Sequence, residues 1–143
     1  MKSYTDLEQS KKLAEILSFE SSDMKWFIPA DNEGEFTEEV TFIENKSEYS
    51  LFDKVTDWND TPYVPCWSLA ALLGVLPIVY TNNKKEVCGP LHIDITDSET
   101  PFVLWYVNPL HKGGIVELKT KECDNLVDAC YEMIIKLYKL KML

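Results

Sequence analysis

The sequence contains no arginine: all 14 of its basic residues are lysines, they are outnumbered by 24 acidic residues, and the formal net charge is −10. Arginine is the side chain that most often makes paired hydrogen bonds with phosphate, carboxylate and guanine groups. A nucleic-acid-binding face also needs positive charge to neutralise the phosphate backbone. The composition therefore argues against a protein that binds nucleic acid directly.

Long apolar runs are absent as well. No segment reaches the roughly 18 consecutive apolar residues from which a transmembrane helix is predicted, so we expect no membrane partner. Asp6 and Glu8 stand where a signal peptide has its apolar stretch. We therefore expect a cytoplasmic protein. A chain of 143 residues is typical of a single domain that can form a core without disulfides or metal.

Motifs that bind cofactors or activate nucleophiles are missing too. The sequence has no glycine-rich phosphate loop and no G-x-S-x-G, and none of its four cysteines forms a C-x-x-C pair. We predict no cofactor, and thiols that are reduced and partly buried. Cys88 and His92 have C-x-x-x-H spacing, and His111 and Cys123 are the two residues that would complete a Cys₂His₂ set. Their intervals do not match a common zinc finger or ribbon, so we predict no metal site and keep these four as the candidate ligands.

The stretch VPCWSLAALLGVLP, residues 64–77, raises the question of a nucleophilic cysteine. Its proline and apolar residues predict a helix over 65–76, apolar on nearly all sides and buried at the centre of the core. Cys66 would then lie at the helix N-terminus, where the dipole favours thiolate. His92 follows on a predicted strand, with Asp94 on the same face, and His111 is a second candidate base.

Two arguments favour a packing role for Cys66 over a catalytic one. Apolar surroundings raise the pKa of a thiol, which disfavours the nucleophilic thiolate. Leu91, Ile93 and Ile95 alternate with His92 and must face the core, so His92 would point away from the helices. We interpret Cys66 as a small core residue and consider an enzyme the less favoured class. A cysteine hydrolase with Cys66 as nucleophile and His92 as base remains the alternative.

The remaining patterns predict an α+β fold of one domain over residues 1–143. Helices are expected over 6–17, with a Thr5–Glu8 capping box, and after a cap at Asn125. Strands over 78–81, 91–96, 102–107 and 115–120 predict an antiparallel meander of three or four strands from about 78 to 120. All three helices are expected to cover one face of it. Residues 18–60 give no clear pattern.

Acidic residues gather in the middle of the chain. Residues 31–60 contain ten acids and two lysines, a net charge of −8. Such a run is usually a solvated face, and the alternative is a binding surface for a basic partner. Trp58 lies in this stretch, is expected to be half-exposed, and is typical of an anchor with an acidic rim. The predicted binding residues are Glu38, Glu39, Asp57, Trp58, Asp60 and Tyr63.

Three stretches together, SYTDLEQSKKLAEIL, VPCWSLAALLGVLP and DNLVDACYEMIIKLYKLKML, resemble a family of small uncharacterised proteins from phages and mobile elements of Bacteroidales gut bacteria. The resemblance implies a small intracellular accessory protein, and it brings no activity, cofactor or catalytic residue. With no catalytic motif and an acidic middle, we expect a non-enzymatic protein-interaction module with a protein partner, for which a basic surface is one option. An acidic mimic of DNA is a further alternative, although the acids do not repeat a regular phosphate pitch. A homodimer also stays open.

Overall fold

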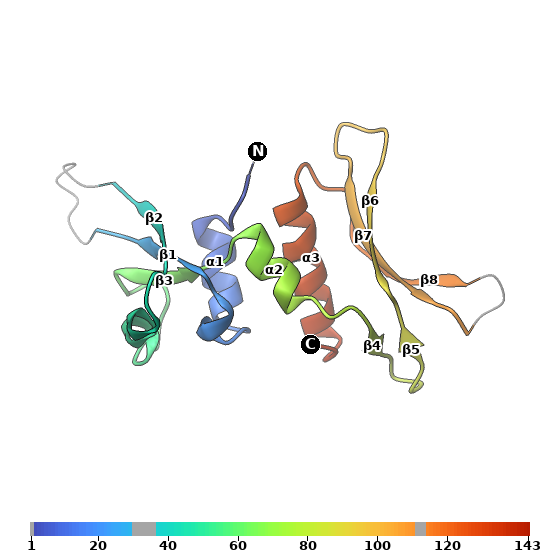
Figure 1. The fold of residues 1–143 in the computed structure, drawn as a ribbon, viewed down its shortest axis with the longest axis horizontal. Helices are drawn as coiled ribbons and strands as arrows, with labels where there is room; N and C mark the ends of the chain where they lie inside the picture. The colour runs from blue at the N-terminus through green and yellow to red at the C-terminus, as the bar shows by residue number, and fades with distance from the viewer. Residues whose placement is uncertain (1, 30–36, 111–113) are drawn as a thin grey trace. The chain divides into compact units, whose positions relative to one another are not determined.

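The computed structural model describes residues 2–29, 37–110 and 114–143. Within these ranges the chain forms three α-helices, two 3-10 helices and eight strands (Figure 1). The strands make three small antiparallel sheets of three, two and three strands. The α+β class is confirmed, whereas the prediction of one meander covered on one face by the three helices is wrong.

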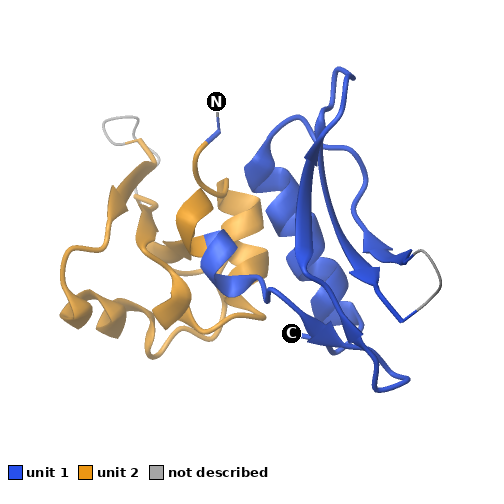
Figure 2. Ribbon diagram, turned by 45° about the vertical axis from the view of Figure 1, so that its right-hand side comes forward, with its two compact units in different colours: residues 1–2, 72–143 blue, residues 3–71 orange. Residues whose placement is uncertain are grey.

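The chain divides into two compact units (Figure 2). Unit 2 comprises residues 3–71, and unit 1 comprises residues 1–2 and 72–143. Compact units of this size can belong to one domain or to two, so the single domain stays a prediction. In the described ranges no helix is both long and apolar enough to cross a membrane.

Unit 2 is built on a sheet with the strand order β2–β1–β3. Its elements are α1 (Leu7–Ala14), η1 (Phe19–Ser21), β1 (Met24–Phe27), β2 (Glu39–Phe42), η2 (Lys46–Phe52) and β3 (Tyr63–Cys66). Successive side chains of a strand point to opposite faces. Met24, Val64 and Cys66 lie on one face and are buried, and α1 contacts β3 and contributes the buried Leu13. This face and α1 form the core of unit 2.

The cap of α1 differs from the predicted one by one residue. Asp6, and not Thr5, is the N-cap: its carboxylate accepts a hydrogen bond from the Gln9 amide at 2.8 Å, and the Gln9 side chain accepts one from the Asp6 amide at 3.2 Å. Thr5 is fully buried instead. The expected Thr5–Glu8 box is therefore wrong, because the Thr5 hydroxyl is engaged inside the core.

Unit 1 contains a two-stranded and a three-stranded sheet. Its strands are β4 (Tyr80–Thr81), β5 (Val87–Cys88), β6 (Leu91–Ile95), β7 (Phe102–Asn108) and β8 (Ile115–Lys119), and its helix is α3 (Leu126–Lys139). β7 is the centre of the three-stranded sheet, and α3 packs against it. Asn125 caps α3 by accepting a hydrogen bond from the Asp128 amide at 2.8 Å, as predicted. The expected positions of β6, β7 and β8 are confirmed to within about one residue.

The predicted central helix over 65–76 is wrong. Residues up to Cys66 belong to strand β3, and helix α2 covers only Leu69–Val75. Pro65 fits a strand here because β3 is an edge of its sheet, where a missing N–H is tolerated. Leu72 is the buried residue of α2, while Leu73 is 37% exposed. The chain passes from unit 2 to unit 1 within this short helix.

Strand β6 also departs from its prediction. Leu91 and Ile93 pair with Tyr106 and Leu104, so the apolar residues of β6 share a face with buried residues of β7. Ile93 and Ile95 are nevertheless 45% and 69% exposed. β6 is an edge strand, and α3 packs on the central strand β7. The predicted alternation of β6 is confirmed, but the predicted burial of Ile93 and Ile95 in the core is wrong.

Candidate functional site

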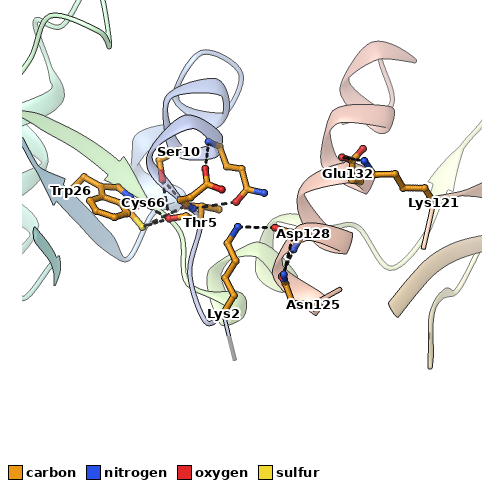
Figure 3. A network of polar contacts seen from close by, with 11 residues as sticks. Lys2, Thr5, Ser10, Trp26, Cys66, Lys121, Asn125, Asp128 and Glu132 are labelled. Carbon is orange, nitrogen blue, oxygen red and sulfur yellow. Dashed lines mark hydrogen bonds and ion pairs between the residues drawn. The ribbon is translucent and has the colours of Figure 1, made fainter. Parts of the chain in front are cut away.

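Cys66 lies in a buried polar network of unit 2 (Figure 3). Its sulfur lies 3.5 Å from the Thr5 hydroxyl, which in turn lies 2.7 Å from the Ser10 hydroxyl. The Trp67 amide donates a hydrogen bond to the same Thr5 oxygen at 3.2 Å. Cys66 is fully buried, and burial raises the pKa of its thiol. The network holds the N-terminal segment against β3. Its hydrogen bonds from Thr5 and Ser10 lower the thiol pKa, but the effect of burial is larger, so the thiol is protonated at neutral pH.

The other candidate catalytic residues belong to unit 1. His92 stacks on Trp105, with ring centroids 4.1 Å apart and planes 10° apart, and Asp94 is exposed on the same strand. The second candidate base, His111, lies outside the described residues. Unit 2 contains no histidine in its sequence. Cys66 is the last residue of strand β3 and does not begin a helix. Its own unit also contains no imidazole that could act as its base.

The candidate metal ligands do not form a cluster in the described part of the chain. Cys88 is buried and pairs with Tyr80 across the β4–β5 strands. The thiol of Cys123 donates to the Lys121 carbonyl oxygen at 3.6 Å. Among residues 2–29, 37–110 and 114–143, no three His, Cys, Asp or Glu side chains are placed to hold a metal ion. His111, the fourth candidate, is not described.

Two of the predicted binding residues lie in one row of the β2–β1–β3 sheet. Glu39 pairs with Phe27, and Phe27 pairs with Tyr63 on its other side. Directly paired residues share a face, so the three side chains lie next to one another on the face opposite Val64. The Phe27 and Tyr63 rings are 5.3 Å apart, and the Lys25 ammonium lies 5.9 Å from the Tyr63 ring centre. Glu38 is exposed immediately before β2.

The other three predicted binding residues lie in the loop between η2 and β3. Asp57 shapes this loop: its carboxylate accepts a hydrogen bond from the Asn59 amide at 2.9 Å, and its carbonyl accepts one from the Asp60 amide at 3.1 Å. Asp57 and Asp60 are exposed. Trp58 is half-buried, as expected, and its ring packs on buried Phe52 at 6.1 Å between centroids.

The net charge is confined to unit 2. Residues 3–71 contain 15 acids and five lysines, a net charge of −10, whereas unit 1 contains nine acids and nine lysines. Most of this charge, −8, comes from residues 31–60, and the other residues of the unit contribute −2. Its surface attracts cationic groups, most strongly at low ionic strength.

Three adjoining surface pockets follow η2 and the loop to β3. The first, of about 600 Å³, lies between η1 and η2 and includes Phe19, Tyr49 and Asp53. The second, of about 600 Å³, shares Ser50 and Asp53 with the first. The third, of about 340 Å³, shares Asp60 and Thr61 with the second. We call these three pockets the acidic groove, because Glu20, Asp53, Asp57 and Asp60 line it.

Sequence reasoning found Asp57 and Asp60 but missed Phe19, Tyr49 and Asp53. The two aromatic residues are 30 positions apart, and only the packing of η1 against η2 brings them together. A local signal existed in the Asn45–Glu48 capping box, which predicts the start of a short helix that contains Tyr49.

Comparisons with protein-family models, with curated protein sequences and with solved structures give no match.

Proposed function

We propose that the chain is a non-enzymatic protein-interaction module, and that unit 2 binds a partner with a basic surface. The observation that carries this proposal is the charge distribution: unit 2 has a net charge of −10 and unit 1 has none. A protein surface with charge of one sign accelerates encounter with a partner of opposite charge and disfavours partners of like charge.

The acidic groove supports a binding role for the same unit. Asp57 and Asp60 are exposed in a loop whose backbone is fixed by hydrogen bonds to Asp57. Trp58 anchors the loop by packing on Phe52. Charges held on an ordered loop cost less conformational entropy on binding than charges on a flexible one. The half-exposed tryptophan beside them has the composition of an interface anchor.

The test is a capture experiment in which a cell lysate is passed over a column that carries the immobilised wild-type chain. The retained proteins are released with a salt gradient and identified by mass spectrometry. A matched column carries the Asp57→Asn/Asp60→Asn double variant, and a control column carries Asp97→Asn/Glu99→Gln, which removes two exposed acids from unit 1. We expect a basic protein to be retained on the wild-type and control columns and released by salt. For the purified partner, loss of the two loop charges should weaken binding about three- to tenfold.

Capture of nothing above background would count against the proposal. The same holds if the partner binds equally well to the Asp57→Asn/Asp60→Asn variant and does not respond to salt, because charge would then contribute nothing to recognition.

A further inference from the structure

The first pocket of the acidic groove combines aromatic walls with carboxylates. Phe19 and Tyr49 both line it, with ring centroids 6.0 Å apart and planes inclined by 36°. Both side chains are half-exposed. Glu20 and Asp53, which also line the pocket, are exposed carboxylates. In the described part of the chain neither carboxylate forms an ion pair with a lysine.

The aromatic walls are held in place before any ligand arrives. Both rings pack on buried Phe52, with centroid distances of 5.7 Å for Phe19 and 6.5 Å for Tyr49. The Tyr49 hydroxyl donates a hydrogen bond to the Ser22 carbonyl oxygen at 2.7 Å. Rings fixed in this way lose little conformational freedom when a ligand stacks on them.

The chemistry of the pocket selects a cation with a flat face. An aromatic ring attracts a cation through its negative face, and arginine is the cation that does this most often in proteins. The guanidinium group is planar, stacks on rings, is more weakly hydrated than an ammonium group, and pairs with carboxylates through several N–H groups. Lys46 also lines the pocket, and its like charge opposes any incoming cation until its side chain turns away.

We propose that Phe19, Tyr49, Glu20 and Asp53 form a subsite for an arginine side chain of the basic partner. The partner is an extended arginine-containing segment whose further basic residues lie along Asp57 and Asp60 in the rest of the acidic groove. This inference rests on the proposed function and names the partner chemistry recognised by the same unit.

The experiment measures binding of three peptides to the intact chain at low salt. The peptides share one nine-residue sequence of alternating glycine and a variable residue, which is arginine, lysine or the uncharged arginine analogue citrulline. Calorimetry gives the affinities, and amide chemical shifts locate the peptide. We expect the arginine peptide to bind about two- to fivefold more tightly than the lysine peptide, the citrulline peptide to bind far more weakly, and the largest shifts to occur around Phe19 and Tyr49.

Four variants make the test specific. Phe19→Leu keeps an apolar side chain against Phe52 but removes a ring face, so it should weaken binding of the arginine peptide more than binding of the lysine peptide and bring the two affinities together. Glu20→Gln/Asp53→Asn should weaken both cationic peptides, whereas Asp97→Asn/Glu99→Gln, with the same loss of charge in unit 1, should affect them much less. Lys46→Met should strengthen binding of the arginine peptide.

Equal affinities for arginine and lysine peptides in the wild-type chain would overturn the subsite while leaving the proposed function in place. Shifts confined to residues outside the pocket, or no binding of any peptide, would also overturn the subsite. The proposed function itself is decided separately by the capture experiment, which does not depend on the pocket.

Discussion

The buried hydroxyl of Thr5 provides the sharpest test of how unit 2 is held together. Thr5→Val replaces the hydroxyl by a methyl group of similar size, so it opens no cavity. The Trp67 amide then loses the oxygen to which it donates at 3.2 Å, in surroundings where Thr5 and Trp67 are both fully buried. An unsatisfied buried donor costs about 1–3 kcal/mol. Because the Ser10 hydroxyl keeps the Thr5 carbonyl oxygen at 3.4 Å, we expect a loss of about 2 kcal/mol in the free energy of unfolding.

Thr5→Ser is the matched control, since it retains the oxygen but loses one buried methyl group. Its expected cost is about 0.8 kcal/mol, the value for one buried methyl or methylene. Urea unfolding followed by tryptophan fluorescence measures both variants, and hydrogen exchange of the peptide covering 61–71 locates the effect. The reasoning would be refuted if Thr5→Val were as stable as the wild type and Thr5→Ser the less stable variant, because packing alone would then explain the residue.

Three further outcomes are expected. Cys66 should resist iodoacetamide in the native protein at pH 7 and react only on unfolding, as read by peptide mass spectrometry, because it is buried and its thiol pKa is raised; rapid native labelling would contradict its packing role. Asn125→Ala should lower the free energy of unfolding by about 1 kcal/mol through loss of the α3 cap, with Asn125→Ser close to wild type in the same urea assay. The pKa of the Glu48 carboxyl is lowered, mainly because its ionised form accepts a hydrogen bond from Lys25. The contribution of this ionised carboxylate to the free energy of unfolding is therefore present above the ordinary carboxyl pKa and is lost as the pH falls through the lowered value. The melting temperatures of wild type and Glu48→Gln should accordingly differ at pH 6 and converge toward pH 2.

Elements with a sustained period could be predicted from the sequence. The α3 stripe from Leu126 to Leu137 follows helical spacing over more than three turns, and Asn125 gives its start. The strands β6, β7 and β8 are separated by turn residues and alternate clearly. In each case the signal is local, and one favourable face is enough to specify the element.

The stretch 64–77 could not be read in the same way. A short run that is apolar on all sides is compatible with a buried strand and with a buried helix. Pro65 indicated a helix start, yet it also fits the edge strand β3. Which of the two forms depends on pairing with Lys25 of β1, about 40 residues earlier, and no local pattern contains that information.

The candidate site shows the same difference between residues that local sequence identifies and residues that only tertiary packing brings together. Asp57, Trp58 and Asp60 were found because they are close in sequence and chemically distinctive. Phe19 and Tyr49 were not found because their proximity depends on the packing of η1 against η2. Charge can be counted along a chain, whereas a pocket wall built from distant segments requires the tertiary structure.

The unequal division of charge has a consequence for the colloidal behaviour of the chain. Unit 1 has as many lysines as acids and exposes large apolar side chains such as Ile78, Ile95 and Leu110 at 74%, 69% and 69%. A body with no net charge near neutral pH is the kind that self-associates and precipitates. The repulsion that keeps molecules of the whole chain apart therefore comes from unit 2, and a partner that neutralised unit 2 would at the same time remove the protection of unit 1 against aggregation.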